Sequence, residues 1–305
     1  RAFKESQYLM TSISSESYSH YPVMLTESIN NLNIKQNGYY VDGTVGLGGH
    51  SIKILEHVKK GFLIGFDRDS NSLKIAQKRL HEFNNFELIH SSYTQLEDTC
   101  NKLNIKQVDG ILLDLGLSSF QLEDNQRGFS HRYDSSLDMR FDNTDDGLTA
   151  GEIIENSSIR DLTNIFNEFG EERNSFRIAR AIKESNEEIN ADTLVSIISR
   201  KTAYKYRIKT YSRIFQALRI KTNNELDHLE LFLNDFMKFL KPGARIVIIS
   251  YHSMEDRMVK HKFKDLKLNK ELKVLTKKPL IPTEEEILDN KRSRSAKMRV
   301  GEKIG

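Results

Sequence analysis

Short apolar segments alternate with amphipathic ones along the first 122 residues. The apolar segments have the length of strands and lie at 39–43, 62–66, 86–89 and 108–113. Between them, residues 51–59 and 70–80 repeat apolar positions at helical spacing. Strands that are apolar throughout and separated by helices are typical of a parallel sheet covered on both faces. We therefore predict an α/β fold with a doubly wound, mostly parallel, Rossmann-like sheet.

The pattern changes after Leu122. Residues 124–146 are polar and have no period, so we expect a long ordered loop, a kind of segment that is usually functional or else disordered. Residues 149–200 contain several short stretches of helical spacing. A longer amphipathic helix is predicted at 215–240, and an apolar strand returns at 245–250. Because the sheet resumes, we expect one interrupted α/β domain rather than two tandem domains. The expected parts are a core of 19–122 and 212–305, an inserted, mainly helical substrate-recognition domain at 123–211, and a loose amino-terminal arm at 1–18.

Composition excludes several classes of protein. The 305 residues include one cysteine, Cys100, which excludes a disulfide scaffold and a four-cysteine zinc site. No apolar run approaches the roughly 18 residues of a membrane span, and the start has no apolar core of a secretory signal. We therefore expect a cytoplasmic protein without a membrane partner. The nine histidines form no His-x-x-His pattern, so we expect no metal site.

Candidate chemistry gathers where the predicted strands end. The first strand leads into residues 42–51, Asp-Gly-Thr-Val-Gly-Leu-Gly-Gly-His-Ser, where glycines allow a ligand to approach the backbone closely. The following helix offers amino-terminal amides. Asp67 ends the second strand, where an acid can accept hydrogen bonds from ribose hydroxyls, and Asp114 ends the fourth. Since open α/β sheets bind ligands at this edge, these residues predict a cofactor that contains a nucleoside.

The residues alone leave three interpretations of the loop open. A dinucleotide site expects a third glycine where Ser51 stands, and Asp42 would repel a pyrophosphate. S-adenosylmethionine fits better, because its sulfonium and amino groups are positive. In the third interpretation the glycines only make tight turns.

Motifs along nearly the whole chain help to choose among these three interpretations of the loop. Besides the loop at 42–51, they include Leu-Leu-Asp-Leu-Gly-Leu-Ser-Ser-Phe-Gln-Leu at 112–122, Leu-Asp-Met-Arg at 137–140 and Ile-Ser-Tyr-His-Ser-Met-Glu-Asp-Arg at 249–257. From about residue 19 to 302 the sequence resembles the bacterial small-subunit ribosomal RNA cytosine-N4 methyltransferases. The resemblance implies an enzyme that uses S-adenosylmethionine to methylate the exocyclic amine of one cytidine in the decoding region of 16S ribosomal RNA.

The resemblance also implies partners and cofactor contacts. The RNA is expected within an assembled small ribosomal subunit, and the enzyme itself could form a homodimer. The implied cofactor-binding residues are Gly48, Gly49, His50, Asp67, Tyr93, Asp114 and Gln121.

Transfer to an amine requires close alignment and acceptors for the amine hydrogens. Many amine methyltransferases place an Asp-Pro-Pro-Tyr-like turn after the fourth strand, whereas this chain has Asp-Leu-Gly-Leu-Ser-Ser at 114–119. The candidate acceptors are backbone carbonyls of that turn and the side chains of Ser118, Asp138 and His252. Each side chain has a structural alternative. Ser118 could cap a helix, Asp138 could pair with a loop arginine, and His252 could hold a loop by a hydrogen bond.

The formal net charge of +3 conceals strong local concentrations of basic residues. Residues 200–221 contain eight Lys or Arg, no acid and several aromatic residues, and 291–299 contain five basic residues and no acid. Such stretches can neutralise phosphates and stack on unpaired bases. The loop arginines Arg127, Arg132 and Arg140 could help to frame the transferred methyl group. The candidate RNA contacts are Lys205, Arg207, Lys209, Arg213, Arg292 and Arg294, with a solvated surface as the alternative.

Two other functions compete with an RNA methyltransferase. A dinucleotide-dependent oxidoreductase is disfavoured by the missing third glycine and by the basic stretches. A ribosome-assembly factor that binds RNA and S-adenosylmethionine without catalysis would use the same residues, so the sequence discriminates it poorly.

Overall fold

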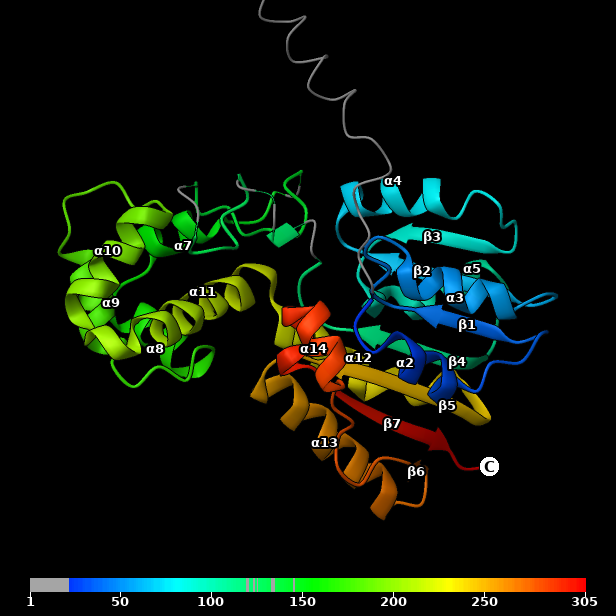
Figure 1. The fold of residues 1–305 in the computed structure, drawn as a ribbon. Coiled ribbons are helices and arrows are strands. Elements are labelled where there is room, and N and C mark those ends of the chain that lie inside the picture. The colour runs from blue at the N-terminus through cyan, green and yellow to red at the C-terminus, as the bar shows by residue number, and fades with distance from the viewer. Residues whose placement is uncertain (1–21, 119–120, 123, 125, 133–134, 145) are drawn as a thin grey trace, which may run out of the picture.

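The structure is a computed structural model that describes residues 22–305 except 119–120, 123, 125, 133–134 and 145. The arm predicted at 1–18 lies outside the described residues. Within the described part, the chain forms a seven-stranded sheet in the order β3-β2-β1-β4-β5-β7-β6 (Figure 1). The strands are β1 (Tyr39–Asp42), β2 (Phe62–Asp67), β3 (Phe86–His90), β4 (Val108–Asp114), β5 (Leu240–Ser250), β6 (Leu272–Val274) and β7 (Lys297–Lys303).

Five strands, β1 to β5, run parallel, and β7 and β6 complete the sheet in antiparallel pairing. The predicted α/β class and mostly parallel sheet are confirmed. The basic run at 291–299 ends in β7, a strand that the sequence analysis did not predict. Met298 and Val300 alternate with charged residues in β7, and both apolar side chains are buried against the sheet. This alternation of period two, rather than the charge, was the informative pattern.

Helices cover both faces of the sheet, as a doubly wound fold requires. They are α2 (Leu25–Leu32), α3 (Gly49–His57), α4 (Ser70–Arg79), α5 (Leu96–Lys102), α12 (Glu225–Asp235), α13 (Ser253–Leu268) and α14 (Glu284–Asp289), with 3₁₀ turns η1 (Tyr93–Gln95), η3 (Phe236–Lys238) and η4 (Lys291–Ser295). On one face Phe236 and Phe263 belong to the cluster that contains Ile111 of β4. On the other face, Ile54 of α3 belongs to the cluster that contains Val247 of β5.

The chain between β4 and β5 forms a separate helical body beside the sheet (Figure 1). It contains α7 (Ala150–Asn156), α8 (Ile159–Glu168), α9 (Ser175–Lys183), α10 (Ala191–Lys201), the 3₁₀ turn η2 (Tyr204–Tyr206) and α11 (Arg207–Asn223). These helices bury their own apolar cluster, with Phe166, Leu194 and Leu218 fully enclosed. We call this body the insertion, and its separate core fits the predicted interruption of the sheet.

The end of the insertion differs from the sequence prediction. The expected helix at 215–240 is divided into α11 and α12 at Asn224, whose φ of 49° lies in the left-handed region. Asparagine tolerates this conformation better than most residues, so the Asn223-Asn224 pair marks the break. Ile214 and Phe215 of α11 pack in the helical core, so the predicted boundary between 211 and 212 falls inside a helix.

No helix in the described ranges combines the length and the apolar character that a bilayer crossing demands.

We predict that Phe166→Ala weakens the insertion selectively. Phe166 is fully buried in the helical cluster, so the truncation should lower the free energy of unfolding of this body by about 3–5 kcal/mol. Hydrogen exchange should then accelerate in α8 to α11 and stay unchanged in β1 and β4. As a matched control, Phe236→Ala should accelerate exchange in the sheet instead. Equal acceleration everywhere with Phe166→Ala would mean that the two cores unfold as one unit.

Candidate functional site

A cavity of about 400 Å³ opens at the carboxyl edge of the parallel strands. The loops after β1, β2, β4 and β5 line it, together with residues of α11 and α12. Of the predicted cofactor residues, the lining contains Gly49, His50, Asp67, Tyr93, Asp114 and Gln121. Gly48 does not line the cavity. It precedes α3 with a φ of 83° and approaches Ala76 of α4, so its part in this region is to turn the backbone.

The loop after β1 presents backbone to the cavity. It turns at Gly46, whose φ of 52° favours glycine, and among the described residues a Cβ there would meet the Cβ of Ser118 alone, at 4.0 Å. Asp42 points away from this space. It is fully buried and accepts hydrogen bonds from the Ser51 hydroxyl (2.6 Å) and the Thr44 amide (3.2 Å). Asp42 therefore fixes the loop, and its burial raises the pKa of the carboxyl to about 6.

Asp67, at the end of β2, lines the cavity with a carboxylate that is held by backbone amides. Its Oδ2 accepts from Gly46 N (2.6 Å), and its Oδ1 accepts from Asp69 N (2.8 Å). Burial raises the pKa of Asp67 to about 6. Because a carboxylate oxygen can accept more than one hydrogen bond, both oxygens can also receive a ligand donor.

Asp114, at the end of β4, forms a pair with Tyr251, which follows β5. The Tyr251 hydroxyl donates to Asp114 Oδ1 at 2.7 Å, and His50 Nδ1 lies 3.9 Å from Asp114 Oδ2. Gly116 (φ 105°) lets the tyrosine ring lie against the turn after β4, because a Cβ there would come within 3.1 Å of the ring. Burial raises the pKa of Asp114 to about 7, although the tyrosine hydrogen bond acts in the opposite direction.

The wall formed by the insertion and α13 carries a buried ionic cluster. Arg219 donates from Nε and Nη2 to the two oxygens of Glu225 (2.8 and 2.9 Å). Glu255 Oε2 accepts from the amides of Tyr251 (2.9 Å) and His252 (3.3 Å). Ligand atoms of Glu225, His252 and Glu255 lie within 4.8 Å of one another, a spacing that a metal ion could bridge. Protein donors bind both oxygens of Glu225 and one oxygen of Glu255, whereas His252 Nε2 is buried without a hydrogen-bond partner among the described residues.

The predicted catalytic residues are not brought together. Ser118 lines the cavity, but its hydroxyl accepts from Gln121 N (3.2 Å) while its amide donates to Gln121 Oε1 (3.0 Å), which is the geometry of a cap. Asp138 forms a bidentate ion pair with Arg140 (2.7 and 2.9 Å) and does not line the cavity. His252 caps α13 and is also absent from the lining. Ser118 and Asp138 make the contacts of their structural alternatives, whereas His252 caps a helix instead of holding a loop.

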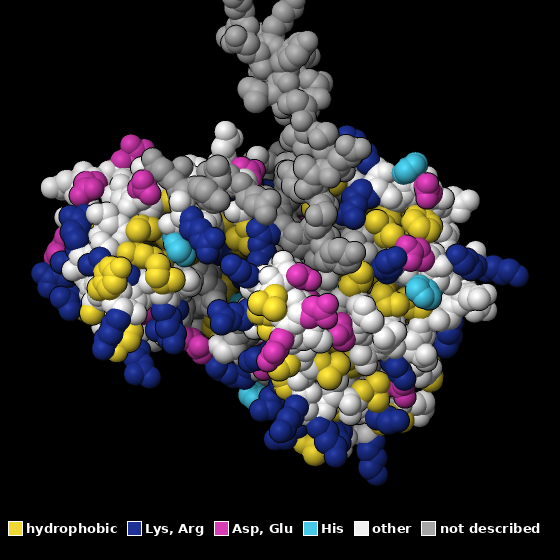
Figure 2. Space-filling view, viewed as in Figure 1, with side chains coloured by type: hydrophobic (Ala, Val, Ile, Leu, Met, Phe, Trp, Pro, Cys, Tyr) yellow, Lys and Arg dark blue, Asp and Glu magenta, His cyan; other side chains and the backbone are white. Residues whose placement is uncertain are grey.

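The predicted RNA contacts fall on two surfaces. On the insertion, the ammonium of Lys205 lies 4.9 Å from the ring centroid of Tyr206, and the guanidinium of Arg207 lies 5.5 Å from that of Tyr204. Both tyrosines are exposed, Tyr204 at 84%, as is Lys209. Figure 2 shows that Lys and Arg side chains are numerous on this body and continue onto the sheet domain.

The other predicted arginines have more individual roles. Arg213 reaches Glu172 at 3.4 Å, Arg292 lines the cavity, and Arg294 is exposed on η4. Arg127 is buried with 3% of its surface exposed, so it is unavailable to the RNA. Arg127 does not line the cavity, and its Nη1 and Nη2 donate to acceptors of the protein itself.

Sequence reasoning missed part of the lining. Tyr251, Arg219, Glu225, His228 and Phe141 all border the cavity. Tyr251 could have been found by the rule that selected Asp67 and Asp114, because it directly follows a predicted parallel strand. The α11 and α12 residues could not, because their position depends on the left-handed break at Asn224.

Comparison with known proteins adds a family to this geometry. Residues 17–304 match the model of the MraW methylase family. The chain is 43% identical to "Ribosomal RNA small subunit methyltransferase H" of Caldicellulosiruptor saccharolyticus, with 94% of this chain and 100% of that protein covered. It is 44% identical to "Ribosomal RNA small subunit methyltransferase H 1" of Acholeplasma laidlawii (93% of this chain and 99% of that protein covered). It is also 44% identical to "Ribosomal RNA small subunit methyltransferase H" of Trichormus variabilis (96% and 94% covered). This protein therefore belongs to the MraW methylase family.

Proposed function

We propose that this protein methylates the exocyclic N4 amine of a cytidine in the decoding region of small-subunit ribosomal RNA, with S-adenosylmethionine as methyl donor. The observation that carries the proposal is the cavity at the carboxyl edge, where the glycine loop and the carboxylates of Asp67 and Asp114 converge. Membership of the MraW methylase family and relatives that are named ribosomal RNA small subunit methyltransferase H support the same chemistry and substrate.

The lining fits this cofactor. His50 Nε2 is buried without a hydrogen-bond partner among the described residues, so a ligand group could satisfy it. Asp67 can accept from ribose hydroxyls, while the open space at Gly46 admits a ligand next to the backbone. S-adenosylmethionine supplies an electrophilic methyl group on a positive sulfonium. The ionised carboxylate of Asp114 in the same cavity favours such a cation.

Asp114 is the best candidate acceptor for the amine hydrogens, in place of Ser118, Asp138 or His252. Tyr251 occupies Asp114 Oδ1 and holds the carboxyl in one orientation, so Oδ2 can accept from the amine. A pKa of about 7 lets the carboxyl accept a hydrogen bond near neutral pH and receive the proton that the methylated nitrogen releases.

The RNA has to present an unpaired base. An amine that is paired inside a duplex cannot enter a cavity, so a single-stranded or flipped-out cytidine is required. The exposed tyrosine and lysine side chains of residues 204–209 offer stacking faces and phosphate contacts on the insertion. We further infer that the substrate is an assembled small subunit, that the protein is cytoplasmic and that it works as a homodimer.

Transfer of a labelled methyl group tests the function. The protein should move the label from S-adenosylmethionine to small subunits that lack this modification, and mass spectrometry of RNA fragments should locate it on the cytidine N4. Tight binding of the cofactor and the subunit with no transfer would instead support an assembly factor.

Replacing Asp67 should weaken cofactor binding. Asp67→Ala removes the proposed ribose acceptor and the acceptor of the Gly46 amide, so calorimetric affinity for S-adenosylhomocysteine should fall by about 1–3 kcal/mol. Asp109→Ala is the matched control, because Asp109 is also a nearly buried strand aspartate but pairs with Lys35 and Lys241 outside the cavity. An equal loss in both variants would indicate general destabilisation.

Affinity for S-adenosylmethionine should rise with pH through about 7. Below its raised pKa Asp114 is neutral, and above it the carboxylate attracts the sulfonium, so the rise should be about tenfold or more. Asp114→Asn should remove this step, and Tyr251→Phe should move it to higher pH, because the tyrosine hydrogen bond lowers the pKa. S-adenosylhomocysteine, whose sulfur is uncharged, should show a smaller step. A step of equal size for both ligands would contradict this role of Asp114.

Reversing two charges on the insertion should weaken RNA binding. Lys205→Glu with Arg207→Glu should lower affinity for small subunits and reduce the slope of log K against log salt by roughly 2, because two phosphate contacts are lost. Lys59→Glu with Lys60→Glu is the control, because these exposed lysines precede β2 at the opposite edge of the sheet. If both pairs change the slope equally, the effect comes from net charge alone.

A further inference from the structure

The turn after β2 contains a second aspartate, Asp69, behind the cavity. Its side chain is fully buried and caps α4, accepting hydrogen bonds from Asn71 N (3.0 Å) and the Ser72 hydroxyl (3.2 Å). Its own amide donates to Asp67 Oδ1. The Asp69 amide thus holds one oxygen of the Asp67 carboxylate, while Gly46 N holds the other, and Asp69 itself does not line the cavity.

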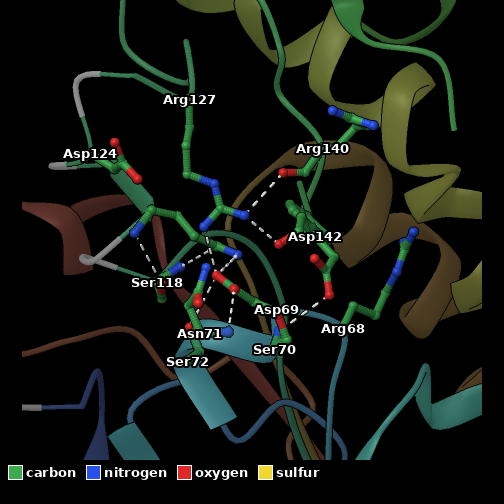
Figure 3. A network of polar contacts seen from close by, with 12 residues as sticks. Arg68, Asp69, Ser70, Asn71, Ser72, Ser118, Asp124, Arg127, Arg140 and Asp142 are labelled. Atoms are coloured by element: carbon green, nitrogen blue, oxygen red, sulfur yellow. Dashed lines mark hydrogen bonds and ion pairs between the residues drawn. The ribbon is translucent and has the colours of Figure 1, made fainter. Parts of the chain in front are cut away.

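Asp69 also binds the polar loop that leads into the insertion. Its Oδ2 accepts from Arg127 Nη1 at 2.7 Å and from Gln121 Nε2 at 3.1 Å. The guanidinium of Arg127 lies between the amino terminus of α4 and the loop that carries Arg140 and Asp142 (Figure 3). The pair is enclosed, with side-chain exposures of 4% for Arg127 and 0% for Asp69.

The other end of the Arg127 guanidinium binds the same loop, and this loop contacts α11. Arg127 Nη2 donates to the carbonyls of Arg140 and Phe141, and the Phe141 amide donates to Asn223 Oδ1 at 2.8 Å. The carbonyl of Asn223 accepts from Arg68 Nη1 at 2.6 Å. These bonds form a closed path from the cofactor turn through Arg127 to the last residue of α11 and back to the residue that follows Asp67.

A second contact supports this path. Asp142 Oδ2 lies 2.6 Å from His90 Nε2. The same oxygen accepts from the Ser70 amide at 3.4 Å (Figure 3). The loop thus rests on β3 and on the start of α4, next to Asp69.

Neither residue of the ion pair borders the cofactor cavity, but several of their neighbours do. Neither Asp69 nor Arg127 lines the cavity, whereas Gln121, Phe141 and Asp67 all do. A buried ion pair is costly to desolvate and often contributes little net stability, so its clearest effect is to select one arrangement of the groups around it. Here those groups belong to the cofactor cavity on one side and to the insertion on the other.

We propose that Arg127 is a positioning residue for the cofactor site, and that its ion pair with Asp69 couples cofactor binding to the position of the insertion against the sheet domain. This inference rests on the proposed function. The cofactor stabilises the arrangement of Asp67 and Gln121 that Arg127 holds, and RNA on the insertion stabilises the same arrangement through the loop. Each ligand then raises the affinity of the other by the same factor.

The test compares Arg127→Gln with the conservative Arg127→Lys and with the control Arg257→Gln. Arg257 also joins the sheet domain to the insertion, through Glu171 at 2.9 Å, but this pair is exposed and distant in sequence from the cofactor turn. Calorimetry gives the Kd of S-adenosylhomocysteine, and filter binding gives the Kd of small subunits with and without it. Steady-state kinetics at saturating cofactor gives kcat.

For the wild type we expect S-adenosylhomocysteine to tighten subunit binding at least about fivefold. Arg127→Gln should raise the Kd of S-adenosylhomocysteine by on the order of tenfold and abolish this tightening, while kcat at saturating cofactor stays within about twofold. Arg127→Lys should recover part of both effects, and Arg257→Gln should retain them. Thermal unfolding identifies a variant that fails to fold, in which case Arg127→Lys carries the comparison.

The outcomes separate the two proposals. If the wild type binds neither cofactor nor subunit, or transfers no methyl group, the proposed function fails. If the wild type is active but folded Arg127→Gln keeps both the cofactor affinity and the tightening, the positioning role of Arg127 is wrong. Equal losses in Arg127→Gln and Arg257→Gln would assign the coupling to general docking of the insertion and would also overturn it.

Discussion

The site depends on the enclosure of aspartates at the carboxyl ends of neighbouring parallel strands. Asp42, Asp67 and Asp114 end β1, β2 and β4, which are adjacent in the sheet, and burial raises the pKa of each. Every carboxyl therefore needs donors, and the chain supplies them from glycine-loop amides, Ser51 and Tyr251. The donors that satisfy the acids also fix the loops, so the electrostatics and the shape of the cavity have a common origin.

Differences in how far these aspartates are enclosed also explain why they have different roles. Asp42 is fully enclosed and holds the glycine loop, whereas Asp67 and Asp114 keep oxygens that a ligand can reach. Asp69 is also fully buried, but besides the backbone amide of Asn71 it binds the guanidinium of Arg127. A carboxylate that requires a cation from another segment of chain becomes a connection between segments.

Much of the core could be predicted from the sequence, because its strands are apolar throughout and end in polar residues with a recognisable role. The positions of β1, β2, β3 and β4 and the acids that follow them depend on local pattern alone. The insertion was harder. Asp138 and Arg127 are both charged residues in an aperiodic loop, and only the folded chain pairs the first with Arg140 and the second with Asp69. The antiparallel β7 was hidden because the charges of Lys297 and Arg299 masked its alternating pattern.

The adjacency of β4 and β5 has a consequence for how the chain assembles. Their pairing joins Leu113 to Ile248, 135 positions later, with the whole insertion in between. A flexible segment of that length would impose an entropic cost on closing the sheet and would slow folding. An insertion that folds first would shorten the effective loop, since its compact helices bring both attachment points towards the same edge. During synthesis, α7 to α11 emerge before β5. The helical body can therefore help β4 and β5 to pair before the protein binds any RNA.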